Sequence, residues 1–322
     1  MKAIVVDAFG DPDVLQLREI PDPAPGAGQV LVKLHAAGVN PVDAYIRTGT
    51  YHRKPPLPWT PGFDGAGVVE QIGSGVTEFA IGDRVYVATL GSWSGTYAER
   101  VVCDATHVHP LPRDVSFARG AALGVPAATA YRALFGKGNA QRGETVLVHG
   151  ASGAVGVPCV QLARAAGLTV IGTAGSDRGM EVARQAGCHH VFSHRDPGRA
   201  DAVREVTGGR GVDLIVEMLA SANLDLDLQL LAPRGRIVVV GSRGRIEIDP
   251  RFTMAKDAAI LGMTLWNVPP DESARIHLAL VEALRSGTLR PIVGREMPLA
   301  EAALAHRALF ESSAEGKIVL VP

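Results

Sequence analysis

Residues 145–156 have the sequence TVLVHGASGAVG, in which a short apolar run is followed at once by a turn containing three glycines. An apolar run of this length is typical of a strand buried on both faces, and glycine permits a tight turn from that strand into a helix. In such a turn Gly153 lets the backbone approach an anionic phosphate, and Gly156 lets the helix pack closely on the strand. The helix start offers unpaired N–H groups to anionic oxygens. This stretch therefore predicts a phosphate-binding turn.

The glycine spacing matches the usual dinucleotide fingerprint only in part. That fingerprint is G-x-G-x-x-G, whereas here Ala151 occupies the first glycine position and Gly150 stands just before it. A tight turn that binds nothing is the alternative for such a string taken alone. The position of this turn, between the first strand and the first helix of an alternating series, favours the phosphate-binding interpretation.

After about residue 120, short apolar segments alternate with helical ones. We expect strands at 145–149, 169–173, 191–193, 212–217 and 236–240, and helices at 155–166, 178–186, 199–206 and 222–231. Alternation of this kind indicates a parallel sheet covered by helices on both faces. The sequence thus predicts an α/β protein with a doubly wound, Rossmann-type domain.

The end of the second expected strand indicates which nucleotide binds. An NAD site usually places Asp or Glu there to accept from the ribose 2′-hydroxyl, but this chain has Gly175 and Ser176. Small neutral residues leave room for a 2′-phosphate, for which Ser176, Arg178 and His194 are candidate partners. NADP(H) is therefore favoured. The alternatives are that Asp177 caps the next helix and that Arg178 is a solvated surface charge.

The sequence on either side of this domain has a different pattern. Short strands broken by Gly and Pro are expected at 3–6, 29–34, 67–72, 84–87 and 97–102, which predicts a small β-rich domain. Helices are expected at 273–286 and 299–310, then an apolar strand at 317–321. Such a strand needs a sheet to join, so we expect the C-terminus to return to the β-rich domain. An edge strand is expected at 258–265.

Composition limits the function classes. The 322 residues suggest roughly two domains, and 47% apolar residues supply a core. Lys and Arg total 32 against 33 for Asp and Glu, a net charge of −1, so no overall positive field attracts nucleic acid or membrane. Three scattered cysteines fit a reduced, cytoplasmic protein. No Cys or His cluster has metal-ligand spacing, so no metal is expected.

The chain resembles the zeta-crystallin branch of quinone reductases, in the medium-chain dehydrogenase/reductase superfamily. The stretches that carry the resemblance are 38–43, 45–54, 60–62, 128–134, 146–156, 217–223 and 239–244. Zinc-dependent members of the superfamily have Gly-His-Glu where this chain has Gly62, Phe63 and Asp64. One departure from the branch is Ala154, where members commonly have Gly.

The resemblance implies a zinc-independent NADPH:quinone oxidoreductase, transferring hydride or single electrons, that forms a homodimer or homotetramer. It implies a GroES-like catalytic domain at 1–123 and 266–322, and a Rossmann NADP(H)-binding domain at 124–265. Cofactor contacts carried over from the branch are Tyr45, Ser152, Gly153, Ala154, Val155, Gly175, His194, Asn223, Val240, Gly241, Ser242, Arg243, Met263, Thr264 and Leu265.

Hydride transfer to a flat quinone requires mainly orientation and exclusion of water. We expect Asn40 to bind the nicotinamide ribose or a substrate carbonyl, and Asp43 to orient Tyr45 or Tyr51. Both tyrosines, and Tyr51 above all, are candidates to stack on the acceptor or donate a proton, and the alternative for each is ordinary packing on the surface or in the core. The alternative for Asn40 and Asp43 is capping of a helix that starts at Pro41.

Two further functions compete with quinone reduction. Reduction of the conjugated double bond of enones or 2-alkenals uses the same hydride geometry. Binding of RNA as a main role is disfavoured, because the chain has no basic track and only 5% aromatic residues.

Overall fold

The computed structural model describes residues 1–310 and 315–322 and divides the chain into two compact units. The β-rich unit comprises Met1–Pro126, Pro270–Gly287 and Pro291–Pro322, and the parallel-sheet unit comprises Ala127–Pro269 and Thr288–Arg290. The sequence prediction places the boundaries at residues 123/124 and 265/266, and it does not assign residues 288–290 to the second unit. Within the described residues, no helix has the length and apolar character needed to cross a membrane.

The parallel-sheet unit is built on a six-stranded sheet in the order β10-β9-β8-β11-β12-β13. Every neighbouring pair in it is parallel. This is the strand order of the dinucleotide-binding fold, so the predicted doubly wound domain is confirmed. The strand order reverses between β8 and β11, and ligands of such sheets bind beyond the carboxyl ends of the strands at that point.

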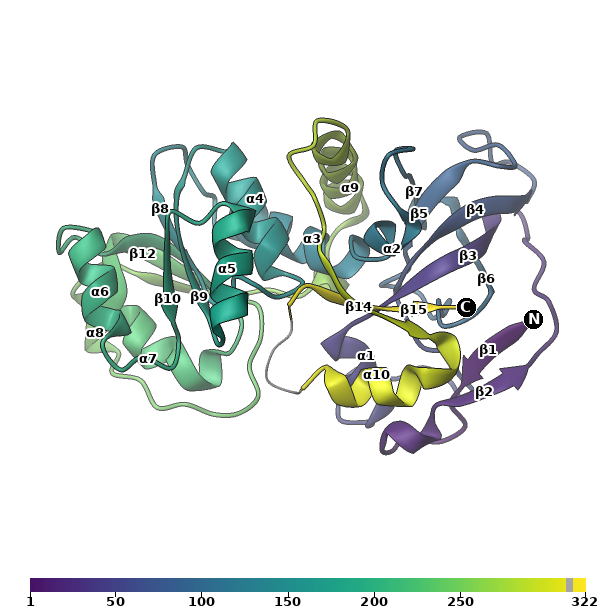
Figure 1. The fold of residues 1–322 in the computed structure, drawn as a ribbon, viewed down its shortest axis with the longest axis horizontal. Helices are drawn as coiled ribbons and strands as arrows, with labels where there is room; N and C mark the ends of the chain where they lie inside the picture. Colours follow the sequence, from purple (N-terminus) through teal and green to yellow (C-terminus); the bar gives the residue numbers. More distant parts are fainter. Residues whose placement is uncertain (311–314) are drawn as a thin grey trace. The chain divides into compact units, whose positions relative to one another are not determined.

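The elements of this unit follow the predicted alternation. They are η3 (Arg132–Lys137), β8 (Thr145–Val148), α4 (Gly156–Ala165), β9 (Thr169–Ala174), α5 (Asp177–Ala186), β10 (His190–Ser193), α6 (Arg199–Val206), β11 (Val212–Glu217), α7 (Ala220–Leu230), β12 (Leu231–Val239), α8 (Arg251–Met254), β13 (Ala259–Gly262) and η4 (Leu265–Asn267). Helices α4 and α5 cover one face of the sheet, and α6 and α7 cover the other (Figure 1). Because both faces are covered, the apolar residues of β8 and β11 are fully buried.

The β-rich unit contains a seven-stranded sheet in the order β14-β15-β3-β4-β5-β7, with β6 also paired to β3, and a two-stranded sheet of β1 and β2. Its elements are β1 (Lys2–Val5), η1 (Pro12–Val14), β2 (Gln16–Glu19), β3 (Gln29–Val39), α1 (Pro41–Arg47), β4 (Asp64–Ile72), β5 (Arg84–Ala88), β6 (Arg100–Asp104), η2 (Ala105–His107), β7 (Val108–Pro110), α2 (Phe117–Gly120), α9 (Pro270–Arg285), β14 (Val293–Pro298), η5 (Leu299–Glu301), α10 (Ala302–Ala308) and β15 (Lys317–Val321). Helix α3 (Gly124–Tyr131) crosses the boundary between the units.

The C-terminal strand joins the N-terminal sheet, as predicted. Strand β15 pairs antiparallel with β3 (Figure 1), so that Val319 lies opposite Gly38. Lys317, at the start of β15, is 1% exposed, and its Nζ lies 2.8 Å from Asp64 Oδ2 on β4. The ion pair therefore links the last strand of the chain to the middle of the sheet.

Several elements differ from their sequence predictions. Strands β2, β7 and β14 were not predicted, because they are short or exposed and lack a clear apolar alternation. The predicted start of β12 at residue 236 is wrong: the strand begins at Leu231, which pairs with Val212 before a register shift. Arg234 has a positive φ of 63° in that irregular part, which the sequence pattern does not signal.

Replacing Lys317 with Met should lower the free energy of unfolding by about 3–5 kcal/mol, because Asp64 would keep a buried charge without its partner. Urea unfolding followed by circular dichroism measures this loss. Lys33→Met is the matched control, since Lys33 is an exposed residue on β3 of the same sheet, and it should change stability by less than about 0.5 kcal/mol. Equal stability of the two variants would contradict the prediction.

Candidate functional site

The predicted glycine turn connects β8 to α4 at the carboxyl edge of the parallel sheet. A Cβ atom on residue 156 would lie 2.1 Å from the carbonyl oxygen of Gly150 and 2.7 Å from the Cα atom of Ala151. No side chain fits in that space, so the turn can close this tightly only with glycine at this position. The N–H of Ala151 donates to the carbonyl of Thr173 at 2.8 Å, which attaches the turn to β9.

The residues predicted to hold the cofactor phosphates lie in this turn. Ser152 is buried, and Gly153, Ala154 and Val155 are half-buried just before the first residue of α4. The first N–H groups of a helix have no partner within the helix. The turn therefore places the backbone N–H groups at the start of α4 next to the half-buried residues 153–155.

The end of β9 has the neutral character that the sequence predicts. A Cβ atom on Gly175 would lie 2.7 Å from Cε1 and Nε2 of His194, so the imidazole lies directly against this glycine. Ser176 is the N-cap of α5, and its Oγ accepts from Gly179 N at 3.0 Å. The alternative that Asp177 caps this helix is therefore wrong. The Ser176 hydroxyl keeps its own O–H for donation, and Arg178 is exposed in the first turn of α5.

The remaining residues predicted to contact the cofactor, apart from Tyr45, lie on segments that come after β11, β12 and β13. They are Asn223, Val240, Gly241, Ser242, Arg243, Met263, Thr264 and Leu265. Backbone hydrogen bonds bring these segments together: Val240 N donates to Glu217 O at 2.8 Å, and Met263 N donates to Val239 O at 3.3 Å. Most of the predicted cofactor residues thus gather at one edge of one sheet.

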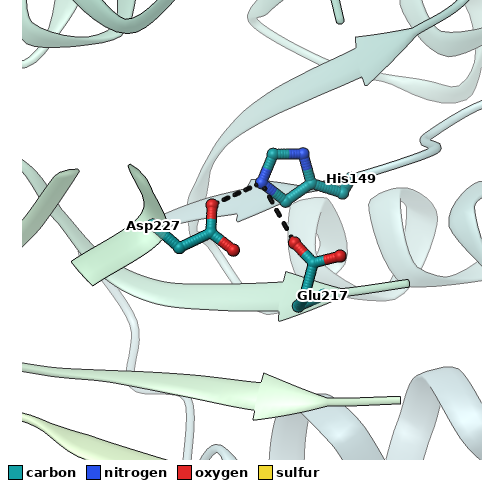
Figure 2. A group of neighbouring side chains, drawn as sticks. All are labelled: His149, Glu217 and Asp227. Carbon is teal, nitrogen blue, oxygen red and sulfur yellow. Dashed lines mark hydrogen bonds and ion pairs between the residues drawn. The ribbon is translucent and has the colours of Figure 1, made fainter. Parts of the chain in front are cut away.

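Three ionisable side chains meet beneath this edge (Figure 2). His149 Nε2 lies 2.8 Å from Asp227 Oδ1 and 3.4 Å from Glu217 Oε2. His149 is 5% exposed, and Glu217 and Asp227 are both fully buried. We call these three residues the buried triad. Among the described residues, they form the one group of three His, Cys, Asp or Glu side chains whose candidate ligand atoms all lie within 4.8 Å of one another.

Burial controls the protonation of the triad. Loss of solvent raises the pKa of Glu217 to about 7 and that of Asp227 to about 7, and it lowers the pKa of His149. At neutral pH the imidazole is therefore neutral, and burial favours the protonated form of the two carboxyl groups. None of the three was predicted from the sequence to be functional. The available signal was Glu217, a charged residue that directly follows the apolar run 214–216 of β11.

Asn40 and Asp43 lie in a different network, inside the β-rich unit. Asp43 Oδ2 accepts from the backbone N–H of Asn40 at 2.8 Å, so Asp43 supplies the reciprocal bond of a capping box at the start of α1. The Asn40 side chain donates to Asp64 Oδ2 at 3.0 Å and accepts from Lys317 Nζ. The two side chains are 2% and 0% exposed, respectively. Helix capping, the alternative raised from the sequence, is what these bonds do for Asp43.

The tyrosine whose hydroxyl donates to Asp43 is Tyr97, which was not among the predicted site residues. Asp43 Oδ2 accepts from Tyr97 OH at 3.0 Å, and the Tyr97 oxygen lies 3.1 Å from His306 Nε2. The Tyr45 ring packs 5.9 Å from that of Phe310, centroid to centroid, and the Tyr51 ring lies 4.5 Å from His52. Sequence reasoning missed Tyr97 and His306, because they are distant from residue 43 along the chain and lie in no motif.

Comparison with known proteins gives a consistent result. A family described as alcohol dehydrogenase GroES-like domain matches residues 26–113, and one described as zinc-binding dehydrogenase matches residues 154–282. A quinone oxidoreductase from Rattus norvegicus is 48% identical over 100% of this chain and 98% of its own length. The chain belongs to the quinone oxidoreductase family.

Two relatives with lower sequence identity also match this chain over almost its whole length. A mycobacterial protein solved in complex with NADPH has a TM-score of 0.89 and 32% identity, with 100% of both chains covered. A 2-haloacrylate reductase from Burkholderia sp is 33% identical over 99% of this chain and 98% of its own length. The family predicted from the sequence is thereby confirmed.

In this member of the quinone oxidoreductase family, Phe63 and Asp64 have a structural role. They stand where zinc-dependent members of the superfamily have the His and Glu of a Gly-His-Glu sequence. Phe63 is 1% exposed in the core. Asp64 Oδ1 accepts from Val125 N at 2.6 Å, while its other carboxylate oxygen pairs with Lys317. These side chains therefore stabilise the β-rich unit and the start of α3.

The Asp43→Asn variant should make stability less dependent on pH. Burial raises the pKa of Asp43 from 3.8 to about 7, so the folded protein holds a proton that the unfolded chain releases. The contribution of this group to the free energy of unfolding therefore decreases as pH rises from about 4 to about 7. Asn cannot titrate, yet its carbonyl oxygen still accepts from Asn40 N and Tyr97 OH.

Urea unfolding at pH 5 and pH 8 measures this effect. Wild type should lose more stability between the two pH values than Asp43→Asn, and the exposed Asp114→Asn variant should match wild type. Parallel profiles for wild type and Asp43→Asn would show that this carboxyl group does not titrate in that range.

Proposed function

We propose that this chain is an NADPH-dependent quinone oxidoreductase. The overall reaction is NADPH + H⁺ + quinone → NADP⁺ + hydroquinone. The observation that carries the proposal is the glycine turn at the point where the strand order reverses, together with the neutral end of β9 at Gly175. The full-length similarity to a quinone oxidoreductase at 48% identity supports the acceptor class.

The residues present fit NADPH. At position 156 a side chain would collide with the turn itself, so α4 starts close against the turn. The half-buried residues 153–155 just before α4 then offer a backbone site for a pyrophosphate. Ser176, Arg178 and His194 offer donors where an NAD site would place an acid. Bound at this edge, NADPH supplies a hydride, or electrons singly, to the acceptor. The chain's own part is to bind, orient and exclude water.

For the acceptor side we propose distinct roles for three residues of the β-rich unit. Tyr51, half-buried after α1, stacks on the quinone or donates a proton to its oxygen. Asn40 and Asp43 act as positioning residues, because their bonds fix the first turn of α1, the helix that carries Tyr45. Tyr45 is proposed to contact the nicotinamide side of the cofactor.

Reduction of a conjugated carbon–carbon double bond is the second candidate. It is favoured by the 33% identity to a protein named 2-haloacrylate reductase. A 2-alkenal accepts hydride in the same geometry as a quinone, and none of the proposed site residues distinguishes the two acceptors. Relative rates on both substrates with one enzyme preparation decide between them.

We also propose a cytoplasmic homodimer or homotetramer. Strand β13 is the edge of the parallel sheet, and Ile260 on it is 39% exposed. An edge strand with an apolar, exposed residue can pair with its equivalent across a two-fold axis. The location is supported by cysteines that are all free thiols.

Activity is tested by NADPH oxidation with 9,10-phenanthrenequinone or 1,2-naphthoquinone. We expect oxidation well above the uncatalysed rate. Arg178→Ala should raise KM for NADPH by about 10-fold to 100-fold, the usual effect of losing a hydrogen bond to a charged group, and should leave KM for NADH nearly unchanged.

Arg184→Ala is the matched control, because Arg184 lies on the same helix and pairs with Glu181 at the surface. Its kinetic constants should equal those of wild type. An NADPH oxidation rate that does not rise when quinone is added would refute the proposed function. An unaltered KM for NADPH in Arg178→Ala would refute only the role of Arg178.

The assembly is tested by analytical ultracentrifugation at micromolar concentration. We expect a species of at least twice the 33.8 kDa chain mass. The Ile260→Lys variant should shift the distribution toward the monomer, because it places a charge on the proposed contact. A single 33.8 kDa species for wild type would contradict the dimer.

A further inference from the structure

The buried triad lies at the point where the strand order reverses. His149 comes directly after β8, and Glu217 ends β11, the two strands between which the chain changes direction across the sheet. Asp227 approaches them from α7. Nothing in the proposed hydride transfer requires two carboxyl groups and an imidazole at this depth, so their role needs a separate explanation.

One hydrogen-bonded arm connects the triad to the glycine turn. His149 Nδ1 lies 3.1 Å from Thr173 Oγ1, and Gly150 N donates to the same Oγ1 at 3.4 Å. Because the Thr173 oxygen accepts from Gly150, its own O–H is available to donate to His149 Nδ1. His149 Nε2 then carries the proton and donates it to Asp227 Oδ1. The arm thus runs from the turn, through β9, to α7.

A second arm connects the triad to a predicted cofactor contact. Glu217 Oε1 accepts from the side chain of Asn223 at 3.2 Å and from the backbone N–H of Leu219. Asn223 lies on the first turns of α7. The position of its amide therefore depends on the position of the Glu217 carboxyl group.

Two oxygens of the triad lack a donor. Glu217 Oε2 and Asp227 Oδ2 are buried, and neither accepts a hydrogen bond among the described residues. Glu217 Oε2 has only the longer ion-pair contact of 3.4 Å with His149 Nε2. Ionised carboxylates only accept, so two of them beside a single imidazole N–H cannot satisfy each other. One added proton on either carboxyl group supplies the missing donor and removes the repulsion between two buried charges.

We infer that the buried triad positions the dinucleotide site and that this role depends on one bound proton. When Glu217 or Asp227 carries the proton, the triad holds the glycine turn and Asn223 in place. When the proton is lost, dinucleotide binding weakens. The inference rests on the proposed cofactor site and adds a dependence on protonation to it. The raised pKa values of Glu217 and Asp227, both about 7, place the change near neutral pH.

Charges on neighbouring elements do not replace this proton. Burial has the largest effect on both groups: it lowers the pKa of His149 and raises that of Asp227. Arg199 on α6 has a smaller effect and lowers both pKa values. His194, after β10, is influenced by His149 and has its own pKa lowered, mainly by burial. Thr173 from β9 and Asn223 from α7 are uncharged. Glu217 and Asp227 are therefore the groups whose titration the inference invokes.

The distances favour a proton over a metal ion at this place. Two ligands of one tetrahedral zinc ion, each about 2.0–2.1 Å from the metal, lie about 3.3 Å apart. His149 Nε2 and Asp227 Oδ1 are 2.8 Å apart, which is the length of a hydrogen bond.

The test measures dissociation constants for NADH and NADPH by fluorescence titration of the full-length protein between pH 6 and pH 9. NADH is included because it lacks the 2′-phosphate, which itself titrates near pH 6. For wild type we expect both constants to rise about 3-fold to 10-fold across this range, the effect of a pKa difference of half a unit to one unit between free and bound protein.

Asp227→Asn should remove this pH dependence. Its amide can accept from His149 Nε2 and donate to Glu217 Oε2, and so it imitates the protonated group. The control is Asp225→Asn, on the same helix, where Asp225 accepts from Gln229 and from the N–H of Asp249. This control should retain the wild-type profile. If Asp227→Asn does not fold, as judged by circular dichroism, Glu217→Gln replaces it with the same expected result.

The outcomes separate the two proposals. A wild-type pH profile in the folded triad variant would overturn the positioning centre alone. Metal analysis that finds a stoichiometric ion in wild type and none in Asp227→Asn would overturn it as well. Failure of wild type to bind either dinucleotide at any pH would overturn the proposed cofactor site, and this inference with it.

Discussion

The close contact between Gly156 and the backbone of Gly150 is the constraint on which the parallel-sheet unit depends. A Cβ atom on residue 156 would lie only 2.1 Å from the carbonyl oxygen of Gly150. Because glycine has no Cβ, helix α4 can begin directly on the turn, with no intervening loop. The helix start, the end of β8 and the end of β9 therefore share one edge of the sheet. The cofactor residues proposed from β9, β11, β12 and β13 gather there because the parallel strands all end on the same side.

The β-rich unit depends on a different kind of interaction. Beside its strand pairing, this unit has a polar, buried link over long range: Lys317, Asp64, Asn40 and Asp43 form one connected network that joins the last strand to the first helix. A buried ion pair is costly unless its partners are all present. The network therefore adds to the backbone pairing of β15 with β3 in stabilising the arrangement in which the last strand joins this sheet.

The sequence predicts the regular parts of the fold well, and it predicts side-chain networks poorly. The alternation of apolar strands and helices from residue 145 onward specifies the sheet, because each strand is buried on both faces. The terminal strand was predictable for the same reason, since an apolar strand needs neighbours. Short exposed strands such as β2 carry no such signal.

For the candidate site residues too, features that are local in sequence could be predicted and contacts between distant residues could not. The glycine turn is local, so its close approach could be predicted from twelve consecutive residues. The partner of Asp43 is Tyr97, and that of His149 is Asp227, and neither pair is close in sequence. Such pairs arise from tertiary packing, which periodicity does not encode. The role of Ser176 as a helix cap also depends on where α5 begins, and sequence places helix starts only approximately.

The contact between Gly175 and the His194 imidazole has a consequence for how nucleotide preference can change during evolution. Because the ring occupies the space that a side chain at residue 175 would need, an aspartate or glutamate introduced there must push the imidazole aside. One codon change would then add an acceptor suited to a ribose hydroxyl and displace the imidazole that we propose as a donor to the 2′-phosphate. On the proposed role of His194, the two preferences exclude each other at this corner, so an intermediate that serves both nucleotides well would be hard to reach.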